Sequence, residues 1–237
     1  MIIQPRRAFG GGELISLIKC GLYHYLNNID PLYQSTYEAL FCSEFSRFMG
    51  GGYTDAVNSG TCAAYVALKA LDLPDNSLVA ISSMCDPGVY NSIIIAGLRP
   101  VPIPIINEDL TFAPTDLHRI LENDSFSALI YVHPFGTNSG TSSLTQIRMR
   151  YPNLKIIEDI SQAIGGTFNE LPLGNFSDVA ISSTMGRKAL ISGASGGLLF
   201  TKTKEIYLRA LSYADRGKSV TSTGQVIKML LLISICP

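Results

Sequence analysis

Short apolar segments alternate with helical patterns along most of this chain of 237 residues, and this alternation restricts its fold more than any other feature. The apolar segments are rich in β-branched residues, as buried strands are; they cover residues 78–82, 101–106, 128–133, 155–159, 179–183 and 197–201. Helical patterns lie between them, at residues 61–71, 88–96, 115–122 and 142–150. Such units predict an α/β fold with an open, mostly parallel sheet and helices on both faces.

The two ends of the chain do not follow this alternation. Residues 10–52 have an irregular pattern that contains one amphipathic helix, at 36–48. We therefore divide the chain into an N-terminal segment with this helix, a large domain and an atypical tail, at residues 1–52, 53–218 and 219–237. The tail ends in an apolar run without a polar face, which fits either a C-terminal strand or a truncated or frame-shifted end.

Charge and cysteine content argue against several classes of function. The net charge is −1 and the basic residues are scattered, which leaves no electrostatic footprint for nucleic acid. Five cysteines lie far apart with only three histidines to join them, so neither a disulfide framework nor a metal site of the zinc type is expected. The N-terminus lacks the apolar core of a signal peptide, and the longest apolar run is far shorter than the roughly 20 residues of a membrane span. We expect a soluble cytoplasmic protein with reduced thiols.

Polar side chains stand where several predicted strands end. Asp159, Ser183 and His133 each close an apolar segment, and ligands of open parallel sheets bind beyond the carboxyl ends of the strands. Lys188 follows Ser183 by five residues. Its amine could hold a pyridoxal-phosphate cofactor covalently, although a surface lysine on a loop is the simpler interpretation. His133 is expected to serve as a structural hydrogen-bonding residue.

Asp159 has two interpretations as well. It could cap the loop that follows its strand, or it could pair with the protonated pyridine nitrogen of the cofactor. Two opposite charges at about 4 Å and an effective dielectric constant of about 20 attract each other by roughly 4 kcal/mol, which would hold the ring protonated. Gln162, three residues further on, could hydrogen-bond the phenolic oxygen of the same ring or be an ordinary loop amide.

A candidate phosphate cradle lies further upstream, at Asn58-Ser-Gly-Thr61. Gly60 lets the backbone approach a ligand, and the start of the next helix offers N–H groups without helical partners and a partial positive charge. The hydroxyl of Thr61 adds a donor. The same residues could also form a plain helix cap. Ser183 would supply a second hydroxyl, but strand alternation leaves Ser182 as its competitor for this role.

Together these motifs resemble those of the DegT/StrS-type pyridoxal-phosphate-dependent sugar aminotransferases, which have the aspartate aminotransferase (type I) fold. The resemblance runs along nearly the whole chain, which makes it far more specific than any single motif. In order, it is carried by Ala56-Val-Asn-Ser-Gly-Thr-Cys-Ala63, Gly97-Leu-Arg-Pro-Val101, Tyr131-Val-His-Pro-Phe-Gly136, Ile157-Glu-Asp-Ile-Ser-Gln-Ala163 and Ser183-(x)4-Lys188.

The resemblance implies a role for each residue of the site. Lys188 would bind pyridoxal 5′-phosphate and carry a proton between the substrate carbon and the cofactor, while Asp159 and Gln162 would bind the ring. The phosphate would be held by Gly60, Thr61 and Ser183. The reaction would transfer an amino group, usually from glutamate, to a nucleotide-linked keto-sugar in surface polysaccharide or amino-sugar biosynthesis. A homodimer is expected, because sites of the family form between two subunits.

The chain departs from the family pattern at three places. Asp86 falls where the family places an aromatic residue that stacks on the cofactor ring, so cofactor affinity is expected to differ. The turn after the lysine reads Gly193-Ala-Ser-Gly-Gly197 in place of Gly-Glu-Gly-Gly. Beyond Lys218 the family continues into a smaller domain, so we expect a truncated form.

Several functions therefore remain open beside the aminotransferase. The chain could be a catalytically impaired remnant that binds the cofactor or a non-catalytic module. It could also be a pyridoxal-phosphate-dependent sugar dehydratase or a desulfurase-like lyase. Lysine at position 188 favours the aminotransferases over the dehydratase branch, which carries histidine at this position.

Overall fold

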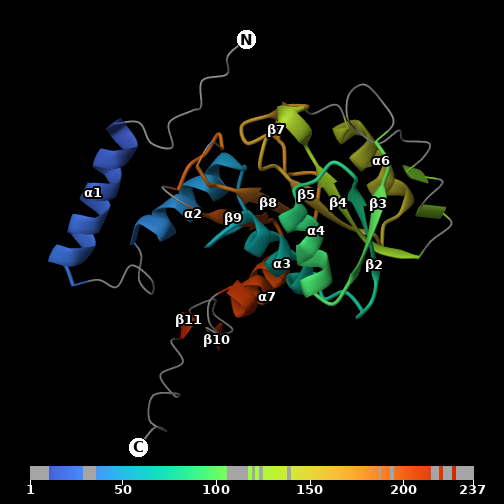
Figure 1. Ribbon diagram of the computed structural model, residues 1–237, viewed down its shortest axis with the longest axis horizontal. Coiled ribbons are helices and arrows are strands. Elements are labelled where there is room, and N and C mark those ends of the chain that lie inside the picture. The colour runs from blue at the N-terminus through green and yellow to red at the C-terminus, as the bar shows by residue number, and fades with distance from the viewer. Residues whose placement is uncertain are drawn as a thin grey trace, which may run out of the picture.

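A seven-stranded sheet forms the centre of the computed structural model (Figure 1), which describes residues 11–28, 36–105, 117–118, 121–122, 125–137, 140–186, 188–192, 195–214, 219–220 and 226–227. Its strands are β1 (Tyr53–Val57), β2 (Leu78–Ser82), β3 (Arg99–Ile103), β4 (Phe126–Val132), β5 (Lys155–Asp159), β8 (Val179–Ser183) and β9 (Gly197–Thr201). They are arranged in the order β1-β9-β8-β5-β4-β2-β3. The strands from β8 to β3 pair in parallel, whereas β9 is antiparallel to both β8 and β1. The predicted mostly parallel sheet is confirmed.

Helices cover both faces of this sheet. One face carries α3 (Gly60–Ala70), α4 (Pro87–Ile95) and α7 (Lys204–Ala214), whose apolar side chains pack on Val79 and Ile81 of β2. The other face carries α2 (Thr36–Phe48) and α6 (Thr141–Arg150). Ala80 of β2 contacts this second layer, because successive side chains of a strand point to opposite faces. Strand alternation thus produces two apolar cores, one on each side of the sheet.

Smaller elements connect or follow the main ones. A short hairpin of β6 (Thr167–Phe168) and β7 (Leu171–Pro172) lies between β5 and β8, and the 3-10 turn η1 (Pro134–Gly136) follows β4. A second hairpin, β10 (Ser219–Val220) with β11 (Val226–Ile227), falls in the predicted tail. The apolar run at 229–235 lies outside the described residues. Of the predicted helix 115–122, residues 117–118 and 121–122 are described and helical.

Two sequence predictions need correction. The strand predicted at 101–106 begins and ends earlier, as β3, because Pro104 and the residue after it have left the ladder. Residues 11–26 are not irregular: they form the helix α1 (Gly11–Leu26), which stands beside the body of the molecule (Figure 1). The rings of Tyr23 and His24 contact Tyr37 of α2, with centroid distances of 5.6 and 5.7 Å. In the described part of the chain, no helix combines the length and apolar character that a membrane crossing requires.

Candidate functional site

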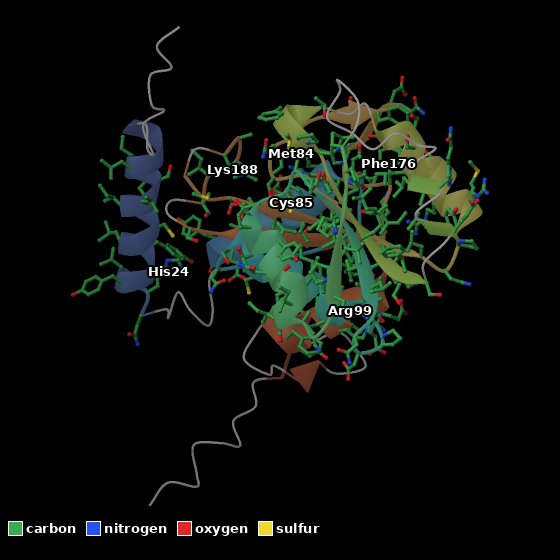
Figure 2. All side chains as sticks on the ribbon, turned by 45° about the vertical axis from the view of Figure 1, so that its right-hand side comes forward. His24, Met84, Cys85, Arg99, Phe176 and Lys188 are labelled. Atoms are coloured by element: carbon green, nitrogen blue, oxygen red, sulfur yellow. The ribbon has the colours of Figure 1, made fainter. Side chains whose placement is uncertain are left out.

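One cavity of about 390 Å³ opens at the carboxyl ends of β4, β5 and β8. Every residue that the sequence predicts for the site lines it: Gly60, Thr61, Asp86, Asp159, Gln162, Ser183 and Lys188. Figure 2 shows Lys188, Met84 and Cys85 near one another at this end of the molecule, with Arg99 at the opposite end. The fold therefore brings together groups that are separated by up to 128 residues in sequence (Gly60 to Lys188).

The start of α3 forms one wall of the cavity. Ser59 caps the helix: its backbone is extended and its hydroxyl accepts a hydrogen bond from the Cys62 N–H at 3.1 Å. The next residue, Gly60, lies so close to Ser183 that a Cβ on it would sit 2.7 Å from the Ser183 Cβ. Only glycine fits here without displacing a neighbour. The wall therefore combines the amide groups of a helix start with the hydroxyl groups of Thr61 and Ser183.

The structure decides between the two neighbouring serines of β8. Ser183 lines the cavity, whereas Ser182 is fully buried and its hydroxyl donates to the Ser183 carbonyl at 3.2 Å. The Ser183 N–H is itself fixed by the Ser161 hydroxyl at 2.8 Å. Ser183 is thus the serine that can reach a ligand in the cavity.

Asp159 ends β5 and contributes a buried carboxylate to the cavity floor. Its side chain is 5% exposed, and Oδ1 accepts a hydrogen bond from the Ser161 N–H at 2.9 Å. Burial raises the pKa of Asp159; the hydrogen bonds from Ser161 and the charges of Lys188 and His133 oppose this shift. A carboxylate placed in this way gains from any cation that enters the cavity.

Gln162 is oriented by a contact with the loop after β4. Its Oε1 accepts a hydrogen bond from the Phe135 N–H at 2.9 Å, and Phe135 adopts the left-handed conformation with φ of 54° to present that group. With the oxygen engaged, the Nε2 amide group remains as a hydrogen-bond donor. Gln162 would therefore offer a donor, rather than an acceptor, to a ligand.

Lys188 follows a turn after β8, and its backbone N–H donates to the Met185 carbonyl at 3.2 Å. The side chain is partly buried rather than fully exposed, which separates it from an ordinary surface lysine. Among the described lining residues, it is the one that carries an amine or guanidinium group. Arg187 and the turn residues Gly193 and Ala194 lie outside the described part of the chain.

Comparison with known proteins identifies the family of the chain that forms this cavity. The model of the DegT/DnrJ/EryC1/StrS aminotransferase family matches residues 27–231. The chain belongs to this family. Three members or neighbours illustrate the relationship, and the chain spans about half the length of the curated relatives it matches.

The GDP-perosamine synthase of Vibrio cholerae is 29% identical over 197 residues, which are 81% of this chain and 53% of that protein. The dTDP-3-amino-3,4,6-trideoxy-alpha-D-glucose transaminase of Micromonospora megalomicea is 30% identical over 176 residues, 73% of this chain and 46% of that protein. The crystal structure of NtdA from Bacillus subtilis with bound PMP superimposes with a TM-score of 0.80 at 23% identity and covers 93% of this chain and 49% of that one. This likeness shows that the fold is that of the aminotransferases.

Asp86 lines the cavity at the start of α4. Its Oδ1 accepts a hydrogen bond from the Gly88 N–H at 2.8 Å, so the carboxylate caps α4. Thr61 and Asp86 both lie close to Gly88. A Cβ on Gly88 would be 2.3 Å from the Thr61 hydroxyl oxygen and 3.0 Å from the Asp86 carboxylate. The Asp86 carboxylate thus stands beside the wall formed by α3.

Several residues that line the cavity are not predicted from the sequence. Ser161 could have been found, because its position two residues after Asp159 is typical of a side-chain-capped turn. Cys85, Met84 and Phe135 carry no such signal, since the fold alone brings them to the cavity. Burial, then the carboxylates of Asp86 and Asp159, raise the pKa of the Cys85 thiol. Cys85 therefore contributes a neutral thiol to the cavity wall rather than a reactive thiolate.

Proposed function

We propose that the chain is the cofactor-binding part of a pyridoxal-phosphate-dependent aminotransferase that moves an amino group from glutamate to a nucleotide-linked keto-sugar. The observation that carries this proposal is the meeting of three groups at one cavity. These are the amine of Lys188, the buried carboxylate of Asp159, and the wall where Gly60 lies against Ser183. An amine, a carboxylate and an anion-binding helix start are what the aldehyde, ring nitrogen and phosphate of pyridoxal phosphate require.

The residues present fit this cofactor. The phosphate would lie at the start of α3, because Gly60 lets the helix start approach Ser183 closely and so brings its amide groups beside the hydroxyls of Thr61 and Ser183. Asp159 would face the ring nitrogen. A protonated nitrogen would supply a positive charge that offsets the cost of burying the Asp159 carboxylate. Gln162 would donate through Nε2 to the phenolic oxygen. When bound, the cofactor supplies an electron sink for negative charge at the substrate carbon.

Lys188 would carry out the proton transfer. Its Nζ is the basic group available on the described cavity wall, so it would hold the cofactor and then accept and return the proton at the substrate carbon. Asp159 would keep the ring nitrogen protonated throughout.

Covalent trapping tests the assignment of Lys188. After incubation with pyridoxal phosphate and reduction with borohydride, we expect peptide mass spectrometry to find the cofactor on Lys188. Lys188→Ala should lose the visible absorbance of the bound cofactor, whereas Lys202→Ala, which removes an exposed lysine before α7, should retain it. The same absorbance in Lys188→Ala would show that this assignment is wrong.

A second measurement separates an aminotransferase from a remnant. Glutamate added to the loaded protein should bleach the visible band, and a nucleotide-linked keto-sugar added next should restore it. If no amino donor bleaches the band, this would favour a protein that binds the cofactor without turnover. A sugar product that has lost a hydroxyl group and has gained no nitrogen would instead favour a dehydratase.

A homodimer and a cytoplasmic location belong to the same proposal. The helix α1 exposes Leu14, Ile18, Leu22 and Leu26, each at least 53% accessible. These positions are four residues apart, so they form one apolar stripe along the helix. A contiguous exposed apolar patch is typical of a surface that binds protein. We propose a second copy of the chain as its partner.

A further inference from the structure

A buried pair of titratable side chains lies behind the cavity. His133 follows β4 and Glu158 lies in β5; both are 0% exposed, and His133 Nε2 is 2.9 Å from Glu158 Oε1. Because Glu158 and Asp159 are neighbours in one strand, their side chains point to opposite faces of the sheet. The pair therefore stands behind Asp159, on the face that does not carry the cavity.

The hydrogen bonds around the pair determine where the protons lie. His133 Nδ1 is 3.2 Å from the Thr137 carbonyl oxygen, which can only accept. Glu158 accepts two backbone N–H bonds, from Gly174 at 3.1 Å and from Phe176 at 2.9 Å. Two such donors favour an ionised carboxylate. His133 thus faces an acceptor at each nitrogen, and an imidazole that donates from both nitrogens is an imidazolium. Phe176 lies apart from Lys188 (Figure 2), as expected for the face behind the cavity.

His133 is also tied directly to the end of β5. Its backbone N–H donates to the Asp159 carbonyl at 3.1 Å, which fixes the imidazole next to the residue that ends the strand. We infer that His133 is held as an imidazolium by Glu158 and acts as a positioning residue, whose positive charge favours the ionised carboxylate of Asp159. The importance of this charge for cofactor binding rests on the proposed function, because a protonated ring nitrogen requires an ionised carboxylate as its partner.

The other titratable groups around the pair leave this role to His133. Burial, then the charge of Glu158, raise the pKa of Tyr131, so the hydroxyl of this residue stays neutral while its ring meets the imidazole edge-on at 5.0 Å. Cys85 on the cavity side is a neutral thiol, since burial and then Asp86 and Asp159 raise its pKa. Within the described residues, the charges that oppose the raised pKa of Asp159 are those of Lys188 and His133. Of these two, His133 is the fully enclosed one.

Nitrogen NMR of the protein without added cofactor tests the protonation state. The chain has three histidines, so His24→Gln and His118→Gln assign the His133 signals by elimination. We expect both ring nitrogens of His133 to show the shifts of protonated donors at pH 7. The shift pattern of a neutral imidazole at pH 7 would overturn the inference. This experiment needs neither the cofactor nor a variant of the pair, so its result is independent of the proposed function.

Substitution tests the effect on Asp159. His133→Gln keeps an amide donor for Glu158 but removes the positive charge. We expect the carboxyl-carbon titration of Asp159 to show a higher pKa and the affinity for pyridoxal phosphate to fall about threefold to tenfold. Glu158→Gln should act in the same direction. The double variant should lose no more than either single one, because the two residues act as a unit.

His118→Gln is the matched control, since it removes a histidine that lies against Tyr151, away from the cavity. It should leave both readouts unchanged. A His133→Gln protein that melts earlier, with the Asp159 titration and the cofactor affinity unchanged, would show that His133 is purely structural. If neither parent nor variants bind the cofactor, the proposed function fails, while the Asp159 titration still decides this inference.

Discussion

At the scale of single residues, the contact between Gly60 and Ser183 is the most sensitive point of the site. Gly60→Ala would place a methyl group 2.7 Å from the Ser183 Cβ, so we expect the free energy of unfolding to fall by about 1–3 kcal/mol and the phosphate wall to open. Isothermal titration should show weaker binding of pyridoxal phosphate. Gly21→Ala, in α1 with nothing within 4 Å, is the control and should leave binding unchanged. Unchanged affinity in Gly60→Ala would contradict the proposed phosphate position.

Asp159 gives a prediction on pH. Because burial raises its pKa in the folded state, its contribution to stability is present below the unfolded pKa of about 3.9 and is lost as the pH rises through the folded value. Asp159→Asn removes this pH-dependent loss of stability, because an amide side chain does not ionise. Without cofactor, the variant should therefore be as stable as the parent in acid and more stable at pH 7, measured by urea unfolding across this range. Its affinity for pyridoxal phosphate should fall at least about tenfold. A variant that is less stable at pH 7 would contradict the burial argument.

Residue identities were easier to predict than residue orientations. The strand-end position of Asp159 and the spacing from Ser183 to Lys188 are visible in the sequence, and the fold does bring these residues to one cavity. The choice of Ser183 over Ser182 required the observed pleat of β8. Gln162 takes its orientation from Phe135, 27 residues away. No local pattern contains such a contact, because it depends on how β4 and β5 pair.

At the scale of elements, Asp86 links the start of α4 to the cavity. Asp86→Ala removes the cap on Gly88 and should lower the free energy of unfolding by about 0.5–2 kcal/mol, measured by thermal or urea unfolding. Asp86→Ser keeps a capping oxygen but removes the negative charge beside Thr61. It should therefore retain stability and bind the cofactor phosphate more tightly, because a like charge has been removed. Equal cofactor affinity in parent and Asp86→Ser would show that the carboxylate does not face the phosphate.

The elements that sequence patterns predict well are those that bury a face against the sheet. The bounds of α2 and β5 agree with prediction because apolar periodicity and packing point to the same residues. The helix α1 was missed because it contains three glycines, Gly11, Gly12 and Gly21, which weaken helical propensity. Its apolar residues also face away from the described core, so no packing partner supports the pattern.

At the scale of the whole molecule, the described residues bring the predicted site together but leave the apolar stripe of α1 exposed. All predicted site residues meet at one end of the sheet. The helix α1 stands beside the body of the molecule (Figure 1), and the side chains of its apolar stripe are exposed. The chain spans about half the length of the curated relatives it matches. A second copy that covered α1 would add contacts which the single chain does not make. Association state and cofactor binding are therefore separate properties that can be measured independently.

Charge placed on the stripe of α1 tests this association. Ile18 is 61% exposed and Leu22 53% exposed, so replacing both by Asp would leave the fold of the body intact but would bury two charges in a dimer interface, where each is costly without a partner. We expect analytical ultracentrifugation to find a dimer for the parent and a monomer for Ile18→Asp/Leu22→Asp. Ser16→Asp adds charge to the opposite side of the same helix and should remain dimeric. A parent that is monomeric at tens of micromolar would refute the dimer, and a double variant that stays dimeric would move the interface away from α1.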